Sequence, residues 1–410
     1  MLAIGAPTVR RAIMSILVLN SGSSSIKIAL FAPETLARIG GGVFERIGTD
    51  STAFSWRAGA AGAAPDARDT PLPRADHRRC LEHLFDALPE IAPEAEPTAI
   101  GHRVVHGGDG FAAAAPVDDA VLEKIEQTGV LAPVHNPVNR LGMEVASRRY
   151  PDTPQVAVFD TAFHQSMPPM ARHYAIPERI AAAWGIRRYG FHGTSHQFLA
   201  RRAAAILGKP LAETRLITLH LGNGASAAAV RGGLSVDTSM GMTPLEGLVM
   251  GSRCGDLDPS VVTYLQREAG MSAAEIDELL NSESGLLGLA GVNDMREIHR
   301  LRGEGHAGAQ LAFEVFCYRV KKYIGAYLAV LGGTDAIVFA GGIGENDAEV
   351  RQECAAGLEA LGIVVDPARN RSAGDGGAIH GDGSPVALLV IRSDEEAEIA
   401  RETLRALAPE

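Results

Sequence analysis

The chain has 410 residues, which is enough for two or three domains with sizeable cores. Its 38 Lys and Arg against 49 Asp and Glu give a net charge of −11, which argues against a protein that binds nucleic acid or an anionic membrane surface. No apolar run is long enough to span a bilayer. The 4 cysteines stand far apart and form no CxxC pair, so we expect reduced thiols in a cytoplasmic protein and no zinc site.

The first residues, Met1 to Ile13, carry Arg10 and Arg11 ahead of an apolar stretch, which faintly resembles an export signal. That stretch lacks a small-residue cleavage site and reads as the start of a strand. We interpret Met1 to Ile13 as a loose leader and Met14 as a candidate start.

The next stretch predicts two strands joined by a tight turn. Apolar residues from Ile16 to Leu19 and from Ile26 to Phe31 flank the small polar cluster Asn20 to Ser25. The hydroxyls and backbone N–H groups of such a turn suit a phosphate chain, and Lys27 could reach back to it as a point charge. An ordinary Ser-rich hairpin is the alternative.

This pattern recurs in the second half of the chain. Ile217 to Ser226 again run from a strand into a turn of Gly and Asn, and the apolar Ala227 to Val230 follow. Two hairpins of this kind, one in each half, indicate a duplicated domain with a nucleotide between the copies.

Strands and helices alternate between the two hairpins, which is typical of an α/β fold. A strand near Ala99 to Val105 precedes helices over Asp118 to Thr128 and Pro137 to Arg149. Gln155 to Phe159 then predict a buried strand that ends at Asp160.

In the second half we expect a helix that Ser195 caps and a long helix over Ala309 to Leu331. The strand Ala336 to Ala340 leads through Gly341, Gly342 and Gly344 into a helix through Leu361, with Asn346 and Glu349 as a capping pair. A strand, a Gly-rich turn and a capped helix favour a nucleotide, although neither the Rossmann nor the Walker spacing is present. A purely structural turn is the alternative.

Phosphoryl transfer requires cations around the migrating group. Arg103 at a strand end and Arg253 in a Gly-flanked loop are suitable, because a guanidinium binds carboxylate or phosphate through two parallel bonds. His192, between Gly190 and Gly193, could donate to an equatorial oxygen. Taken singly, each could equally be a surface ion pair or a histidine satisfied by backbone.

Nine segments resemble the successive motifs of the acetate kinases, in the family order and from about Met14 to the C-terminus. They are LVLNSGSSSIK, GHRVVHGG, LAPVHNP, VAVFDTAFHQSMP, RYGFHGTSH, HLGNGAS, MGMTPLEGLVMGSRCGD, FAGGIGEN and SDEEAEIA. The resemblance implies an α/β fold of two duplicated ribonuclease-H-like domains of the actin and sugar-kinase type, with a nucleotide cleft between them. The N-terminal domain would span 14–163, completed by about 395–410, and the C-terminal nucleotide-binding domain 164–394.

The resemblance also implies roles for individual residues. Asn20 and Glu395 would hold Mg²⁺, or Mn²⁺, through waters. Asp160, His192 and Arg253 would be catalytic, and Arg103, Val105, Val134, Phe191 and Pro244 would bind acetate. The nucleotide would contact Lys27, His220, Leu221, Gly222, Asn223, Gly224, Asp294, Met295, Arg296, Gly342, Ile343, Gly344, Glu345 and Asn346.

Val134 departs from the residue common in the family, and the role that the family assigns to Asp160 is open to question. Acetate kinases commonly have Leu where this chain has Val134, which affects the acyl pocket. The family labels Asp160 as acid/base, but a carboxylate substrate with a pKa near about 4 is already ionised at neutral pH. We therefore interpret Asp160 as a residue that orients an arginine or a magnesium-bound water.

The activity implied is ATP + acetate ⇌ ADP + acetyl phosphate in an enzyme without nucleic-acid or membrane partners. The alternatives are the same chemistry on propionate or butyrate, a sugar kinase, or a chaperone-like ATPase. The family suggests a homodimer, with the helix Ala309 to Leu331 as a candidate interface.

Overall fold

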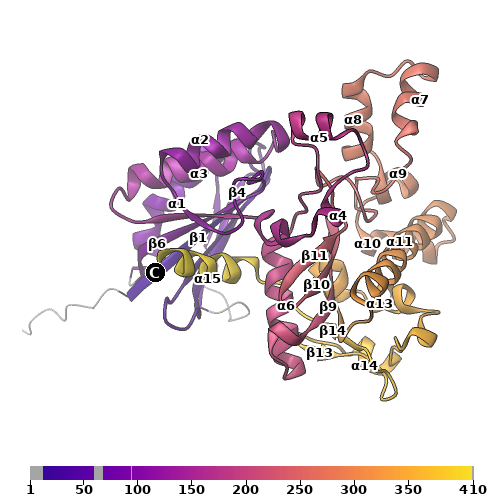
Figure 1. Cartoon of the computed structure of the whole chain (residues 1–410). Helices are drawn as coiled ribbons and strands as arrows, with labels where there is room; N and C mark the ends of the chain where they lie inside the picture. The colour runs from indigo at the N-terminus through magenta and orange to yellow at the C-terminus, as the bar shows by residue number, and fades with distance from the viewer. Residues whose placement is uncertain (1–12, 60–67, 94, 409–410) are drawn as a thin grey trace, which may run out of the picture. The chain divides into compact units, whose positions relative to one another are not determined.

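The computed structural model describes residues 13–59, 68–93 and 95–408 (Figure 1). The leader interpreted at Met1 to Ile13 therefore lies, except for the backbone of Ile13, outside the described residues. The chain forms two compact units, which are residues 1–162 with 395–410 (unit 1) and residues 163–394 (unit 2). No helix among the described residues is long and apolar enough to cross a membrane.

Unit 1 is built on an eight-stranded sheet in the order β5-β4-β3-β2-β1-β6-β8-β7. The predicted hairpin is confirmed, because β1 and β2 pair antiparallel up to Ser21 and Ile26. On its other side β1 runs parallel to β6, which runs parallel to β8. The strands are β1 (Ile13–Ser21), β2 (Ile26–Phe31), β3 (Arg38–Glu45), β4 (Ala53–Ala58), β5 (Arg68–Pro71), β6 (Ala95–Val104), β7 (Ala115–Pro116) and β8 (Gln155–Phe159).

Both faces of this sheet are covered, because successive side chains of a strand point to opposite faces. Leu17 and Leu19 of β1 pack with the helices α1 (His77–Ile91) and α3 (Asn136–Arg149). Ile16 and Val18 pack instead with the C-terminal helix α15 (Glu395–Leu407), which lies along the N-terminal strands (Figure 1). The helix α2 (Asp119–Gln127) and the turn η1 (Thr128–Leu131) precede α3.

Unit 2 repeats the topology of unit 1. Its sheet has the order β11-β10-β9-β12-β14-β13, with β9 antiparallel to β10 and parallel to β12. The run β11-β10-β9-β12-β14 thus matches β3-β2-β1-β6-β8 strand for strand, and the predicted duplicated α/β fold is confirmed. The strands are β9 (Arg215–Leu221), β10 (Ala225–Arg231), β11 (Leu234–Thr238), β12 (Ala336–Ala340), β13 (Gly377–Ala378) and β14 (Ala387–Val390).

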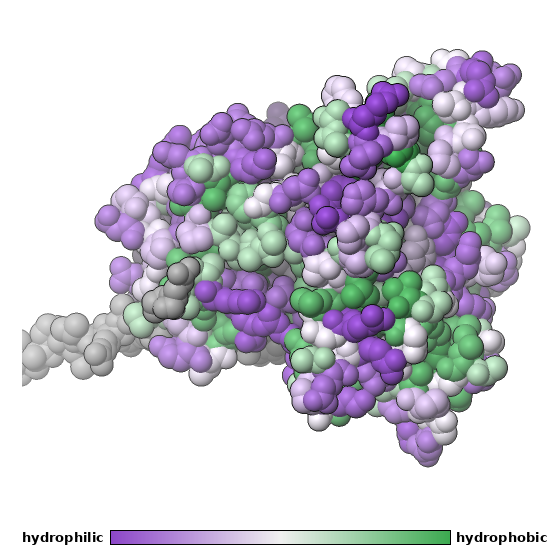
Figure 2. All heavy atoms as spheres, viewed as in Figure 1, coloured by the Kyte–Doolittle hydropathy of each residue, from purple (hydrophilic) through white to green (hydrophobic). Residues whose placement is uncertain are grey.

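Helices surround the second sheet. Leu199, Ala200 and Ala203 of α6 pack on alternate residues of β9, β10 and β12, and the long α11 contacts β9 and β10. Figure 2 shows hydrophobic residues on the viewed surface around α11 and α13. The helices are η2 (Ala162–Ser166), α4 (Pro169–Arg172), α5 (Glu178–Trp184), α6 (Gly193–Leu207), η3 (Leu211–Glu213), α7 (Ser260–Glu268), α8 (Ala273–Ser282), α9 (Gly285–Ala290), α10 (Met295–Gly303), α11 (Ala307–Leu331), α12 (Gly341–Asn346), α13 (Ala348–Ala355), η4 (Glu359–Leu361) and α14 (Pro367–Arg371).

Two predicted caps are wrong. The helix α6 begins three residues earlier than expected, with His192 as its N-cap, and Ser195 lies in its first turn, where its Oγ is 2.8 Å from Nδ1 of His220. The helix predicted to run from the cap Asn346 through Leu361 is capped by Asp347 instead, which accepts from the backbone N–H groups of Glu349 and Val350. This helix is α13, which ends at Ala355, and Asn346 is the last residue of the short α12.

Candidate active site

In unit 1 a buried ion pair lies at the carboxyl ends of neighbouring parallel strands. Arg103 is in β6 and Asp160 directly follows β8. The guanidinium donates from Nη2 to Oδ2 of Asp160 at 2.6 Å, and from Nε to Oδ1 at 3.0 Å. Asp160 is 1% exposed. Its carboxylate thus holds Arg103 in one orientation through a two-pronged contact.

Asn20, at the end of β1, joins this ion pair to α15. Its Oδ1 accepts from Nη1 of Arg103 at 3.1 Å. Its Nδ2 donates to Oε1 of Glu396 at 3.0 Å and to Oε2 of Glu395 at 3.4 Å. Glu396 was not among the predicted site residues, although the acidic run that opens α15 was the signal for it.

Arg103 lies among three acidic side chains. Burial alone lowers the pKa of its guanidinium, but Asp160 and the charges of Glu395 and Glu396 outweigh it, so the pKa is raised. The two glutamates and Asn20 supply oxygen atoms, which Mg²⁺ prefers as ligands. Among the described residues no three His, Cys, Asp or Glu side chains are grouped to hold a metal. A magnesium ion beside Glu395 and Glu396 would therefore keep waters and use substrate oxygens, as Mg²⁺ commonly does.

The two predicted apolar substrate residues of unit 1 differ in burial. Val105 follows β6 and is 4% exposed, whereas Val134, just before α3, is 59% exposed. The N–H of Val105 donates to Oδ1 of Asn139 at 3.1 Å, and Nδ2 of Asn139 donates to the Ser21 carbonyl at 2.8 Å. Through Asn139, α3 ties the end of β6 to the end of the first hairpin strand.

In unit 2, His192 and Arg253 meet beside one glycine. A Cβ placed on Gly224 would lie 3.6 Å from Nε2 of His192 and 3.7 Å from Nη1 of Arg253. Arg253 also donates from Nη1 to the Pro244 carbonyl at 3.3 Å, which brings a third predicted residue to this place. Burial lowers the pKa of Arg253, which does not discharge a group that ionises so strongly. The neighbouring Phe191 is fully enclosed, at 2% exposure.

His192 has an unusual backbone. Its φ of +56° lies in the left-handed region, which a side chain other than Gly, Asn or Asp rarely adopts. The residue is the N-cap of α6 and makes no side-chain cap bond. Its ring points elsewhere: Nδ1 lies 2.9 Å from Oγ of Ser226, and the ring stacks at 4.5 Å, tilted, on His220.

A pocket of about 600 Å³ opens in unit 2 beside the turn of the second hairpin. Eight predicted nucleotide residues line it, together with two that the sequence reasoning missed, Asn293 and Asp347. The lining consists of Gly222, Asn223, Asn293, Asp294, Met295, Arg296, Gly342, Ile343, Asn346 and Asp347. The two missed residues are polar neighbours of predicted ones, and that proximity was the only signal for them.

Other predicted nucleotide residues have different surroundings. Oε1 of Glu345 accepts from the N–H groups of Gly341 and Ser393, so this side chain closes the turn after β12. Leu221 is buried, and Gly224 faces His192 and Arg253. Lys27, in unit 1, lines a groove with Arg38 and Arg57.

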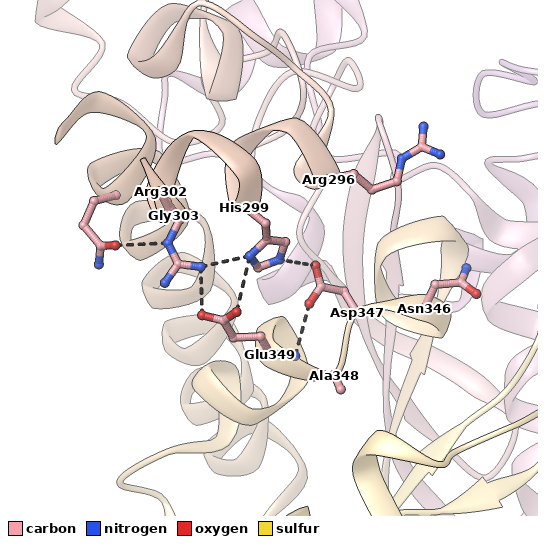
Figure 3. Close-up of a pocket in the computed structure, with 9 residues that line it drawn as sticks. Arg296, His299, Arg302, Gly303, Asn346, Asp347, Ala348 and Glu349 are labelled. Atoms are coloured by element: carbon pink, nitrogen blue, oxygen red, sulfur yellow. Dashed lines mark hydrogen bonds and ion pairs between the residues drawn. The ribbon is translucent and has the colours of Figure 1, made fainter. Parts of the chain in front are cut away.

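A second pocket of about 600 Å³ adjoins the first and shares Arg296, Asn346 and Asp347 with it (Figure 3). His299 of α10 connects its walls, because Nε2 is 2.7 Å from Oδ2 of Asp347 and Nδ1 is 3.3 Å from Oε2 of Glu349. Arg296 instead forms an exposed pair with Asp294 and lowers the pKa of that carboxyl to about 2.

The family model described as the Acetokinase family matches residues 15–401. The chain belongs to this family. It is 52% identical over 400 residues to an acetate kinase of Syntrophobacter fumaroxidans, a match that covers 96% of this chain and 97% of that protein.

Two solved structures of acetokinase-type enzymes are also close to this one. A propionate kinase from Francisella tularensis has a TM-score of 0.89 at 41% identity, and an acetate kinase from Porphyromonas gingivalis has 0.89 at 39%. Each match covers 96% of this chain and 100% of that structure. The resemblance predicted from the nine motifs is thereby confirmed.

Proposed function

We propose that this chain is an acetate kinase, which transfers a phosphoryl group reversibly between ATP and acetate. The observation that carries the proposal is the turn of the second hairpin. Gly222 and Asn223 line the nucleotide pocket, and Gly224 faces His192 and Arg253. A nucleotide in that pocket would extend its phosphates along the turn toward the imidazole of His192 and the guanidinium of Arg253.

The chemistry assigned to these side chains is charge stabilisation. During in-line transfer, negative charge is spread over the equatorial oxygens of the migrating group. The guanidinium of Arg253 and an N–H of His192 would donate to those oxygens from fixed positions, and fixed donors need no reorganisation as charge develops. Arg103, oriented by Asp160, would bind the acetate carboxylate through two parallel bonds.

Magnesium would be held by Glu395 and Glu396, with Asn20 beside them. When bound, it would neutralise charge on the nucleotide phosphates.

The direct test is a hydroxylamine trap. Purified protein with ATP, Mg²⁺ and acetate should accumulate a hydroxamate, because acyl phosphates react with hydroxylamine and sugar phosphates do not. The matched reaction replaces acetate with glucose and should give none. ATP turnover without hydroxamate from any short carboxylate would exclude the proposal and favour a sugar kinase or an ATPase.

Propionate is the second candidate substrate. It is favoured by Val134, which is shorter than the leucine commonly found there, and by the propionate kinase among the similar structures. The same trap, run with acetate, propionate and butyrate at equal concentrations, ranks the three by kcat/KM.

We also propose that the enzyme is a homodimer that uses α11. This helix exposes Leu311 at 48% and Tyr318 at 63%, although its opposite side is buried in unit 2. Both residues line a groove with Val315. Sedimentation of the wild type and of Leu311→Glu/Tyr318→Glu tests this: the wild type should be dimeric and the variant monomeric.

A further inference from the structure

A chain of hydrogen bonds runs behind His192 into the interior of unit 2. Oγ of Ser226 lies 2.9 Å from Nδ1 of His192 and 2.8 Å from Nε2 of His196. On its far side, Nδ1 of His196 lies 2.7 Å from Oγ1 of Thr218. Ser226, His196 and Thr218 have no exposed surface, so no bulk water competes for these bonds.

The donors and acceptors of this chain can be counted. A serine hydroxyl has one proton to donate, so Ser226 can donate to only one of the two imidazoles and must accept from the other. Burial pushes the pKa of His196 well below 6.5, so its ring is neutral and carries one N–H. Two arrangements remain, in which every hydrogen bond points toward His192 or every one points away from it.

The donor role proposed for His192 selects one of the two arrangements. Its Nε2 is on the side of Gly224 and Arg253, and its Nδ1 is on the side of Ser226. A neutral His192 can donate from Nε2 only if Nδ1 is unprotonated and accepts. All bonds then run in one direction, from Thr218 through His196 and Ser226 to His192.

We propose that Ser226 is a positioning residue, which donates to Nδ1 of His192 and thereby fixes the tautomer with its proton on Nε2. This inference rests on the proposed function for the role of that proton, which His192 would direct at the migrating phosphoryl group. His196 and Thr218 fix the direction of the Ser226 hydroxyl, so the effect of Ser226 is transmitted through His192 alone. The strained backbone of His192 is consistent with a ring held in place by its partners.

The first test is steady-state kinetics of Ser226→Ala. Loss of one buried hydrogen bond should lower kcat about tenfold, since such a bond is worth about 1.4 kcal/mol. KM for acetate and for ATP should change less than about twofold, because uniform substrate binding is untouched. Ser226→Thr restores the hydroxyl and should recover most of the loss.

Ser235→Ala is the matched control. Ser235 is equally buried in unit 2, and its Oγ lies 2.8 Å from Nδ1 of another buried histidine, His164. This variant removes a serine–histidine bond of the same kind, but Nε2 of His164 contacts the Phe191 carbonyl and not the His192 ring. It should lower stability, and it should lower kcat less than Ser226→Ala does. Equal losses of kcat in Ser226→Ala and Ser235→Ala would reduce Ser226 to a general structural role and overturn the proposal.

The second test reads the tautomer directly and does not depend on activity. Nitrogen-15 spectra of ring-labelled protein, recorded at about pH 8 to keep histidines of ordinary pKa neutral, distinguish N–H from bare ring nitrogens. The resonances of His192 are identified by their loss in His192→Gln. The wild type should carry the proton on Nε2, and Ser226→Ala should show a mixture of tautomers. A wild-type proton on Nδ1 refutes the proposal even if both variants of Ser226 misfold.

The two tests separate this inference from the proposed function. A wild type that forms hydroxamate while Ser226→Ala retains full kcat and an unchanged spectrum refutes only the role of Ser226. A wild type that forms no hydroxamate but shows the Nε2 tautomer, lost in Ser226→Ala, refutes the reaction and leaves the positioning role intact.

Discussion

Asp160 is enclosed by Arg103 so completely that it has little freedom to move a proton. Both carboxylate oxygens accept from the guanidinium, and the side chain is 1% exposed. Asp160→Asn leaves Arg103 buried with a neutral partner, so kcat/KM for acetate should fall about 10- to 100-fold. The residual rate should keep a plateau in its pH profile. If the wild-type rate instead follows one ionisation that the variant abolishes, Asp160 is a base.

Arg253 should matter most for turnover. If it stabilises the migrating group, Arg253→Ala should raise the barrier by about 3 kcal/mol or more, which lowers kcat at least a hundredfold. Affinity for ATP, measured by calorimetry, should be nearly unchanged because Arg253 does not line the nucleotide pocket. Arg74→Ala removes an exposed guanidinium of unit 1 and serves as the control. Near-normal turnover of Arg253→Ala would place this residue outside the reaction.

Val134 decides the substrate, if it lines the acyl pocket as the resemblance implies. One methylene is worth about 1 kcal/mol in an apolar site. Val134→Leu should therefore lower kcat/KM for propionate relative to acetate by about fivefold. We expect acetate to remain the better substrate of the wild type. Identical ratios in both proteins would show that Val134, which is largely exposed here, does not contact the acyl chain.

At this scale the sequence predicted residues at the ends of strands better than residues inside them. Arg103 and Asp160 could be expected to meet, because parallel neighbouring strands end at the same edge of a sheet. Ser226 follows the turn of the second hairpin, and nothing in the local pattern indicates a partner for its hydroxyl. Its contact with His192 depends on the left-handed turn before α6, which no local propensity indicates.

Among the elements, α12 and α13 illustrate how the choice of cap residue sets where a helix begins. The sequence predicted Asn346 as the cap of the helix after the Gly-rich turn, but Asp347 accepts from two N–H groups of α13, and Asn346 is instead the last residue of α12. The break between α12 and α13 places Asp347 in the wall of both pockets. A competition between two adjacent cap residues is decided by tertiary partners, here His299, which the sequence alone does not bring near.

The link between His299 and Asp347 should therefore control nucleotide affinity (Figure 3). His299→Ala removes the partner that holds the Asp347 carboxylate, and the start of α13 should loosen. We expect KM for ATP to rise about three- to tenfold, with kcat and KM for acetate unchanged, since one such hydrogen bond is worth about 1 kcal/mol. Glu297→Ala, on the same helix but paired outward with Arg300, should leave KM for ATP as it is. A variant His299→Ala with normal KM would separate Asp347 from nucleotide binding.

For the molecule as a whole, buried neutral histidines predict sensitivity to acid. Burial lowers the pKa of His102 in unit 1 and of His164 in unit 2 to about 4, outweighing their hydrogen bonds. The ordinary value is 6.5, so unfolding takes up protons between about pH 6.5 and 4. Stability is therefore full above this window and is lost as pH falls through it, by about 1.4 kcal/mol per pH unit for each group.

Unit 1 allows this to be measured separately. The protein has 2 tryptophans, and Trp184→Phe leaves only Trp56, which is buried in unit 1. Urea midpoints followed by Trp56 fluorescence should fall between pH 7 and pH 5, and less steeply when His102 is replaced in His102→Gln. Parallel pH dependence in both proteins would mean that His102 titrates normally.

The sequence predicted the duplicated architecture because two hairpins with the same polar turn recur half a chain apart. The matching strand order of the two sheets could not be predicted from local sequence patterns, because it depends on crossover connections of many residues.

One consequence follows from the return of the chain to its first unit. The sheet of unit 1 is complete once residue 162 has been made, but Ile16 and Val18 stay uncovered on one face until α15 arrives. Unit 2 is continuous, so all its residues leave the ribosome before α15 does. Unit 2 can therefore finish folding before unit 1, although the synthesis of unit 1 begins first. During that interval the nascent chain carries an exposed apolar sheet, which is the kind of surface that chaperones recognise.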